Sequence, residues 1–168
     1  MNMETSARLY SFNYNELRTY LWSMLFVACN ILLPQVFHLV PQGGIVFAPL
    51  SLVILAGSYK LGWKTGLLAA VASPLVNHLL TGMPAWDMLP LMTLKLAALA
   101  LLAGLAAQHF KRVSLPLIVG VVLVAELLGA LAELLLTGGI ASTVQDFSVG
   151  YPGLLLQVAG TWIVCKYL

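Results

Sequence analysis

Residues 89–107 read LPLMTLKLAALALLAGLAA, an apolar stretch with one charged residue, Lys95, inside it. A helix that crosses a bilayer needs about 20 predominantly apolar residues, and this stretch approaches that length. An unpaired charge at the centre of such a helix costs at least ~2.5–3.5 kcal/mol, so a charged residue there normally faces a partner or a polar cavity. The stretch therefore predicts a membrane helix with a polar contact or binding site around Lys95.

The composition of the whole chain also favours a membrane protein. Of its 168 residues, 61% are hydrophobic and 8% are charged, whereas a soluble domain has roughly 25% charged residues. A soluble protein of this length needs a polar shell, and this sequence has too few polar residues to form one. The net charge of +2 does not indicate a nucleic-acid partner, because the basic residues have a membrane explanation. We expect an all-α, multi-pass protein of the inner (plasma) membrane, with the lipid bilayer as its surroundings.

Six apolar segments follow one another along the chain, separated by clusters of helix-breaking residues. They cover approximately residues 19–40, 45–59, 65–80, 88–108, 115–137 and 151–167. The second and third segments are short for a membrane span. The distribution of the basic residues nevertheless favours counting both as spans.

With six spans, every Lys and Arg outside the apolar segments falls on one side of the membrane: Arg8, Arg18, Lys60, Lys64, Lys111, Arg112 and Lys166. The other side has no Lys or Arg and holds Asp87 and Asp146. Because cytoplasmic loops are enriched in Lys and Arg, we expect a compact bundle of six transmembrane helices with both termini cytoplasmic. The chain is then a single membrane domain over residues 1–168, with 1–18 as a cytoplasmic lead-in and 19–168 as the six-helix bundle.

Three ionisable residues lie within the predicted spans. From a rise of 1.5 Å per residue, Lys95 lies roughly 10 Å below the outer surface, Glu133 about 6 Å and Glu126 about 16 Å. The two glutamates are seven residues apart and so share one face of their helix, and Gln157 of the last span lies at roughly the depth of Lys95. Two interpretations stay open: Lys95 and one glutamate form a structural ion pair, or these residues line an outward-facing pocket.

The pocket is favoured because the other unusual polar residues gather on the same side. Small-molecule sites combine a few polar groups with apolar and aromatic walls. The sequence has no Walker-type phosphate loop, no HExxH and no GxSxG, and its histidines lack metal-site spacing, so we expect no enzyme, no cofactor and no metal site. The predicted substrate-binding residues are Lys95, Glu126, Glu133, Gln157, Trp86, Asn77, His78, Phe147 and Tyr151.

Two segments carry a resemblance to a known family: FAPLSLVILAGSYKLGWKTGLLAAVASPLVNHLLTGMP (Phe47–Pro84) and SVGYPGLLLQVAGTWIVCKYL (Ser148–Leu168). Together with the six-span pattern, they resemble the substrate-binding S component of energy-coupling factor (ECF) transporters. The resemblance implies a subunit that binds a vitamin or related micronutrient at an outward-facing site, built mainly from the last three helices and the outer loops. It also implies a transmembrane T component and two cytoplasmic ATPases as partners, with the first three helices as the docking half.

The chain departs from that family at two places. The first span, LWSMLFVACNILLPQVF, lacks the AxxxA docking pattern, and Asn2 stands where nickel and cobalt members have a histidine. A second hypothesis is a non-transporting membrane scaffold of a cell-envelope assembly, similar in size and number of spans to the MreD-type shape proteins. In a scaffold, the intramembrane charges join helices to one another and no small molecule binds.

Overall fold

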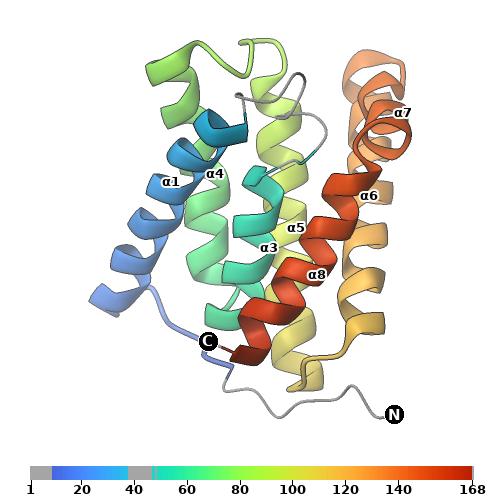
Figure 1. Cartoon of the computed structure of the whole chain (residues 1–168). Helices are drawn as coiled ribbons and strands as arrows, with labels where there is room; N and C mark the ends of the chain where they lie inside the picture. Colours follow the sequence, from blue (N-terminus) through green and yellow to red (C-terminus); the bar gives the residue numbers. More distant parts are fainter. Residues whose placement is uncertain (1–8, 38–46, 48, 168) are drawn as a thin grey trace.

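The computed structural model describes residues 9–37, 47 and 49–167, and within them the helices are joined by turns and irregular backbone, without a strand (Figure 1). The predicted all-α class is confirmed for this part of the chain. The helices are α1 (Leu17–Phe37), α3 (Pro49–Leu61), α4 (Trp63–Thr81), α5 (Leu89–Phe110), α6 (Leu115–Thr137), α7 (Ala141–Ser148) and α8 (Tyr151–Tyr167).

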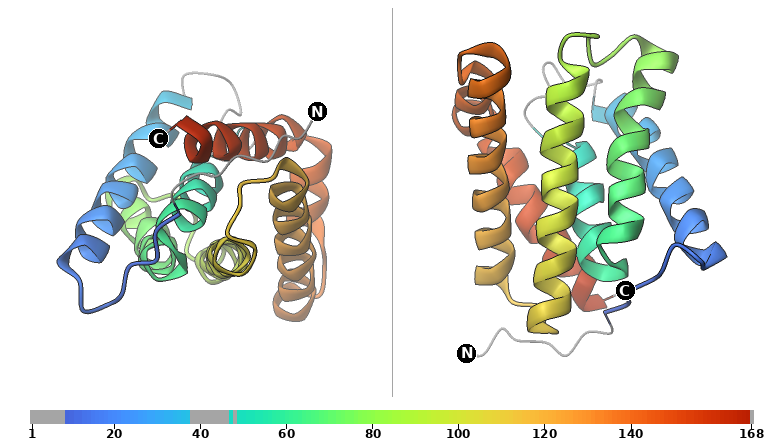
Figure 2. Two further views of the ribbon diagram at one scale, coloured as in Figure 1. Left: turned by 90° about the horizontal axis from the view of Figure 1, so that it is seen from below. Right: turned by 180° about the vertical axis from the view of Figure 1, so that it is seen from behind.

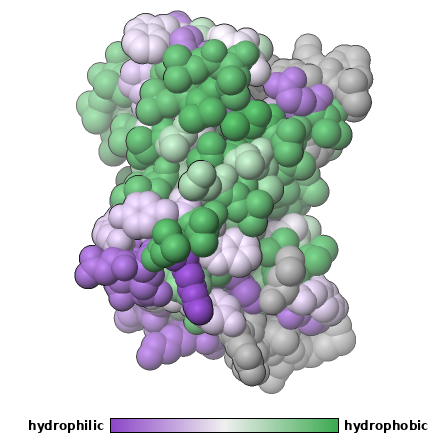
Figure 3. Space-filling view, turned by 90° about the vertical axis from the view of Figure 1, so that its left-hand side faces the viewer, coloured by the Kyte–Doolittle hydropathy of each residue, from purple (hydrophilic) through white to green (hydrophobic). Residues whose placement is uncertain are grey.

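Three of the described helices, α1, α5 and α6, are long and apolar enough to cross a membrane. Much of their surface is exposed hydrocarbon, for example Leu32 of α1 and Leu135 of α6, which are 66% and 77% exposed. Figure 3 shows an apolar band across the middle of the α1–α4 side of the molecule, with hydrophilic side chains gathered at one end and a few at the other. These features indicate a membrane protein.

Helix α3 lies at the centre of the bundle. It contacts α1, α4, α5 and α8, and the views from below and behind in Figure 2 place it between α8 and the α4–α5 pair. Residues 54–59 of α3 are all buried. Before Lys60 in its last turn, this short helix contains only apolar, aromatic and small residues, which suits a helix with neighbours on several sides. The core therefore forms around α3, with α1 and α6 on the periphery.

The long helices alternate in direction, so their connections gather at two ends (Figure 1). One end holds the start of α1, the α3–α4 and α5–α6 connections and the end of α8. The other end holds the α4–α5 connection and α7. Apart from Lys95, the basic residues of the described part lie at the first end: Arg18, Lys60, Lys64, Lys111, Arg112 and Lys166.

The lead-in before α1 is fastened to that end, at the connection between α3 and α4. This connection is the single residue Gly62, with φ +97°, a conformation that favours glycine. Residues 9–16 pass beside it: the Tyr10 amide donates to the Lys60 carbonyl at 2.8 Å, and Gln108 Nε2 donates to Ser11 Oγ at 2.8 Å. Of the predicted lead-in, residues 1–8, including Arg8, lie outside the described residues.

The connection predicted between the last two spans contains a helix that the sequence reading did not predict. Helix α6 ends at Thr137 and is followed by the C-cap residue Gly138, which has φ +75°, and α7 then occupies 141–148. The glycines at 138, 139 and 150 favoured one continuous connection. Residues 140–149, however, include neither Gly nor Pro. A further helical turn is therefore compatible with the local sequence.

Candidate functional site

The charged residues within the bundle meet between α5 and α6. Lys95 Nζ lies 3.9 Å from Glu133 Oε2. Glu133 is buried, with 4% of its surface exposed, and the Lys95 side chain is 18% exposed. Glu133, one of the two glutamates that the sequence left open, is thus in ion-pair contact with Lys95.

Helix α7 contributes a third residue to this pair. The backbone amide and Oγ1 of Thr143 donate to Glu133 Oε2 at 2.9 and 2.8 Å, and Lys95 Nζ donates to Thr143 Oγ1 at 3.4 Å. Hydrogen bonds to a charged group are stronger than those between neutral groups, so this contact fastens α7 to α6. The sequence reading missed Thr143 because it lies in the segment predicted as a connection, where a threonine carries no signal of its own.

A glycine on α6 makes room for the lysine. Gly129 lies one turn before Glu133 on the same face of α6, and a Cβ atom added there would lie 3.0 Å from both Cγ and Cε of Lys95. The absence of a side chain therefore lets the lysine stem lie across α6. Glu126 is half-buried two turns before Glu133, so α6 presents a second carboxylate deeper along the helix.

Helix α8 adds a buried amide at the same half of the bundle. Gln157 is 1% exposed, and its Oε1 accepts no hydrogen bond from any residue that the structure describes. Leaving a buried acceptor unsatisfied costs about 1–3 kcal/mol, so a donor from water or a ligand would stabilise this position. Two other predicted residues, Phe147 of α7 and Tyr151 in the first turn of α8, are exposed near it in sequence.

The predicted residues of α4 and the α4–α5 connection lie elsewhere. Asn77 is buried and donates through Nδ2 to the backbone carbonyls of Asn30 and Ser73 at 2.9 and 3.1 Å, so it joins α4 to α1. His78 Nδ1 lies 2.8 Å from the carbonyl oxygen of Pro84, which accepts its hydrogen bond. The His78 and Trp86 rings pack with centroids 5.1 Å apart.

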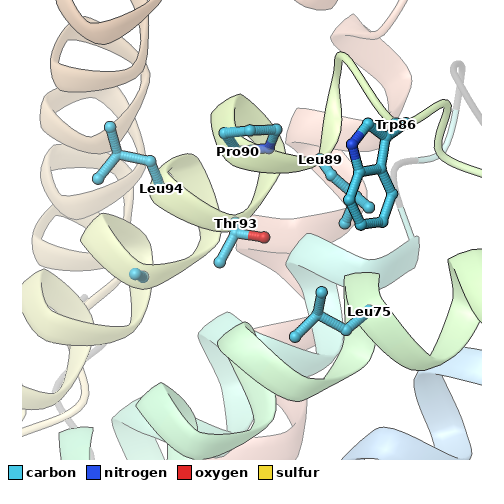
Figure 4. A pocket seen from close by; sticks show the side chains of 7 residues that line it. Leu75, Trp86, Leu89, Pro90, Thr93 and Leu94 are labelled. Carbon is cyan, nitrogen blue, oxygen red and sulfur yellow. The ribbon is translucent and has the colours of Figure 1, made fainter.

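An apolar groove of about 410 Å³ lies between α4 and the first turns of α5 (Figure 4). Its lining residues are Leu75, Trp86, Leu89, Pro90, Thr93, Leu94 and Ala97. Lys95 follows Thr93 by two residues, which turns it by about 200° around the helix axis. The groove and the ion pair therefore lie on different sides of α5, and Trp86 is the one predicted residue that lines the groove.

The residues that the structure describes contain no group of three His, Cys, Asp or Glu side chains that could hold a metal ion. Comparisons with protein-family models, with curated proteins and with solved structures find no match. The chemistry of the site therefore rests on its own geometry. The site is a pair of oppositely charged side chains within hydrophobic helices, near the end of the molecule where the described connections contain no Lys or Arg.

Proposed function

We propose that this chain is the substrate-capture (S) subunit of an ECF-type importer in the plasma membrane. In this proposal α1, α3, α4, α5, α6 and α8 each cross the membrane. Their alternating directions support this topology, as does the gathering of basic residues at the end with the α3–α4 and α5–α6 connections. Since cytoplasmic loops are enriched in Lys and Arg, that end and both termini face the cytoplasm, and α7 lies outside.

The ion pair of Lys95 and Glu133 is the observation that carries the proposal. Glu133 lies four residues before the end of α6 at Thr137, or about 6 Å along the helix axis. Charged residues in membrane helices are expensive, and they commonly mark the path or site of a polar ligand. The half-buried Glu126 and the buried, unsatisfied Gln157 Oε1 add acceptors on two helices of the same half. We place a polar micronutrient there, a vitamin or a related compound.

In this proposal the chain binds its substrate but does not drive transport. The sequence has no phosphate-binding loop, so a transmembrane T component and two cytoplasmic ATPases supply the energy. The chain needs no cofactor of its own and performs no chemical step. The exposed aromatic residues Phe147 and Tyr151 at the α7 end offer flat apolar contacts to a substrate entering from outside.

One observation favours the alternative, a membrane scaffold comparable to the MreD-type shape proteins. Glu133 Oε2 accepts two hydrogen bonds from Thr143 in addition to its contact with Lys95. A carboxylate held in this way by the protein's own groups suits a contact that joins helices. Under this alternative, the cluster stabilises the bundle and no small molecule binds.

Mass spectrometry of small molecules retained by the purified protein separates the two functions. We expect the wild type to retain one small polar compound, and Lys95→Met to retain at least ~10-fold less, which corresponds to about 1.4 kcal/mol. Lys111→Met is the matched control, because it removes an exposed ammonium at the opposite end. A wild type that retains no small molecule favours the scaffold. Unchanged retention by Lys95→Met contradicts the placement of the substrate at Lys95 and makes its contact with Glu133 a structural ion pair.

A further inference from the structure

The groove between α4 and α5 differs in chemistry from the polar site. Small-molecule pockets of about 300–1,000 Å³ normally combine apolar walls with several placed polar groups. The groove has a volume of about 410 Å³, but its lining side chains are hydrocarbon except for the Thr93 hydroxyl and the indole of Trp86. Figure 4 shows Trp86 at one side of the groove and Leu75 across from Thr93 and Leu94. This lining suits a hydrocarbon ligand.

The length of the groove matches part of one membrane leaflet. Its residues on α5 run from Leu89 to Ala97, which is about 12 Å along the helix axis. The hydrocarbon core of a bilayer is about 30 Å thick, or about 15 Å per leaflet. Helix α5 is one of the described helices that could cross a membrane, and the groove begins at its first turn. A ligand lying in it would therefore extend from the membrane surface towards the midplane.

Exposed apolar side chains follow the groove-lining Leu75 on α4. Leu79 and Leu80 of α4 are 81% and 65% exposed, and Trp86 at the rim is 72% exposed. Trp residues gather at membrane–water interfaces, where their rings lie at the level of the lipid headgroups. The packing of Trp86 against His78 places two polar ring edges at that level. The surroundings of the groove are thus those of a lipid site.

We propose that the groove binds one acyl chain of a bilayer phospholipid, with the glycerol and headgroup beside Trp86 and His78. The proposal depends on the membrane location of α5 and stands independently of the transport function. A transmembrane helix of a partner fits less well, because a helix is about 10–12 Å wide and a stable interface buries about 800 Å² per partner. Seven residues line this groove.

Native mass spectrometry of delipidated protein, titrated with palmitoyl-oleoyl phosphatidylglycerol, tests the proposal. We expect the wild type to bind one phospholipid tightly and Ala97→Phe to bind it at least ~10-fold more weakly, because the new ring fills the groove. Ala132→Phe is the matched control, since it adds the same ring to a half-buried position on α6. Thr93→Val removes the one hydroxyl while keeping the shape of the side chain. We expect both of these variants to bind within ~2-fold of the wild type.

Two results would overturn the acyl-chain assignment. Unchanged binding by Ala97→Phe means that the lipid lies elsewhere. A loss in Thr93→Val as large as that in Ala97→Phe means that the groove recognises a polar group. Size-exclusion chromatography of each variant verifies the fold, and Ala97→Leu fills the groove with a smaller side chain if the Phe variant does not fold. Weak binding by Ala97→Leu together with wild-type binding by Ala132→Phe supports the proposal in that case.

Discussion

Removal of the Lys95 charge should destabilise the bundle by an amount that the geometry allows us to estimate. Two unit charges 3.9 Å apart interact by about 4 kcal/mol at an effective dielectric constant near 20. Breaking a buried pair by removing one partner typically costs about 3–5 kcal/mol, because the other charge stays buried. In Lys95→Met, Glu133 still accepts two hydrogen bonds from Thr143, which offset part of that cost.

The expected loss in Lys95→Met is therefore about 2 kcal/mol of unfolding free energy. For a chain of roughly this length, 1 kcal/mol shifts the melting temperature by about 2–4 °C, so we expect a decrease of about 4–8 °C. Glu133→Gln in the same chain removes the stranded carboxylate charge but keeps an oxygen that can accept from Thr143. The double variant should therefore recover at least about half of the loss, which is the coupling expected of residues in contact.

Thiol accessibility provides the assay. Cys165 is fully buried, so in a Cys29→Ala background a thiol-reactive dye labels the protein only as it unfolds. Fluorescence against temperature in detergent then gives the midpoint for each variant, with Lys111→Met as the charge-removal control at the exposed opposite end. An unchanged midpoint in Lys95→Met, or a double variant less stable than Lys95→Met, would refute the coupling between these residues.

Three further outcomes are expected. Ala141 at the α7 end and His109 at the opposite end of the bundle are both exposed. In a cysteine-free background, an impermeant maleimide added to intact cells should label Ala141→Cys but not His109→Cys. The reverse pattern contradicts the proposed orientation. Substrate uptake should be absent from a host without any ECF T component and ATPases, and robust uptake there would instead indicate a stand-alone carrier. Asn77→Leu should lower stability by about 1–2 kcal/mol through the loss of its hydrogen bond to Asn30 of α1 and of a second one to Ser73 within α4, with unchanged ligand retention. Reduced retention at wild-type stability would return Asn77 to the binding site.

The sequence by itself determined the class of the protein and most of its helices. Two predicted segments, 115–137 and 151–167, coincide with α6 and α8, because long apolar runs and the Pro and Gly residues around them are local signals. The gathering of basic residues at one end also follows from the order of segments along the chain. The second segment was predicted from residue 45; residues 45, 46 and 48 lie outside the described residues, and the segment from Pro49 onward is helical in α3.

Only the tertiary structure decided which side chains meet. Both glutamates share a face of α6, and the contact between Lys95 and Glu133 depends on how α5 is rotated and shifted against α6. Helical periodicity predicts that the two glutamates share a face, but it does not predict how α5 is placed against α6. The same holds for Asn77, which the packing of α1 on α4 turns towards Asn30. Thr143 enters the cluster only because a short helix folds back onto α6, and eight residues carry too weak a local signal to predict that contact.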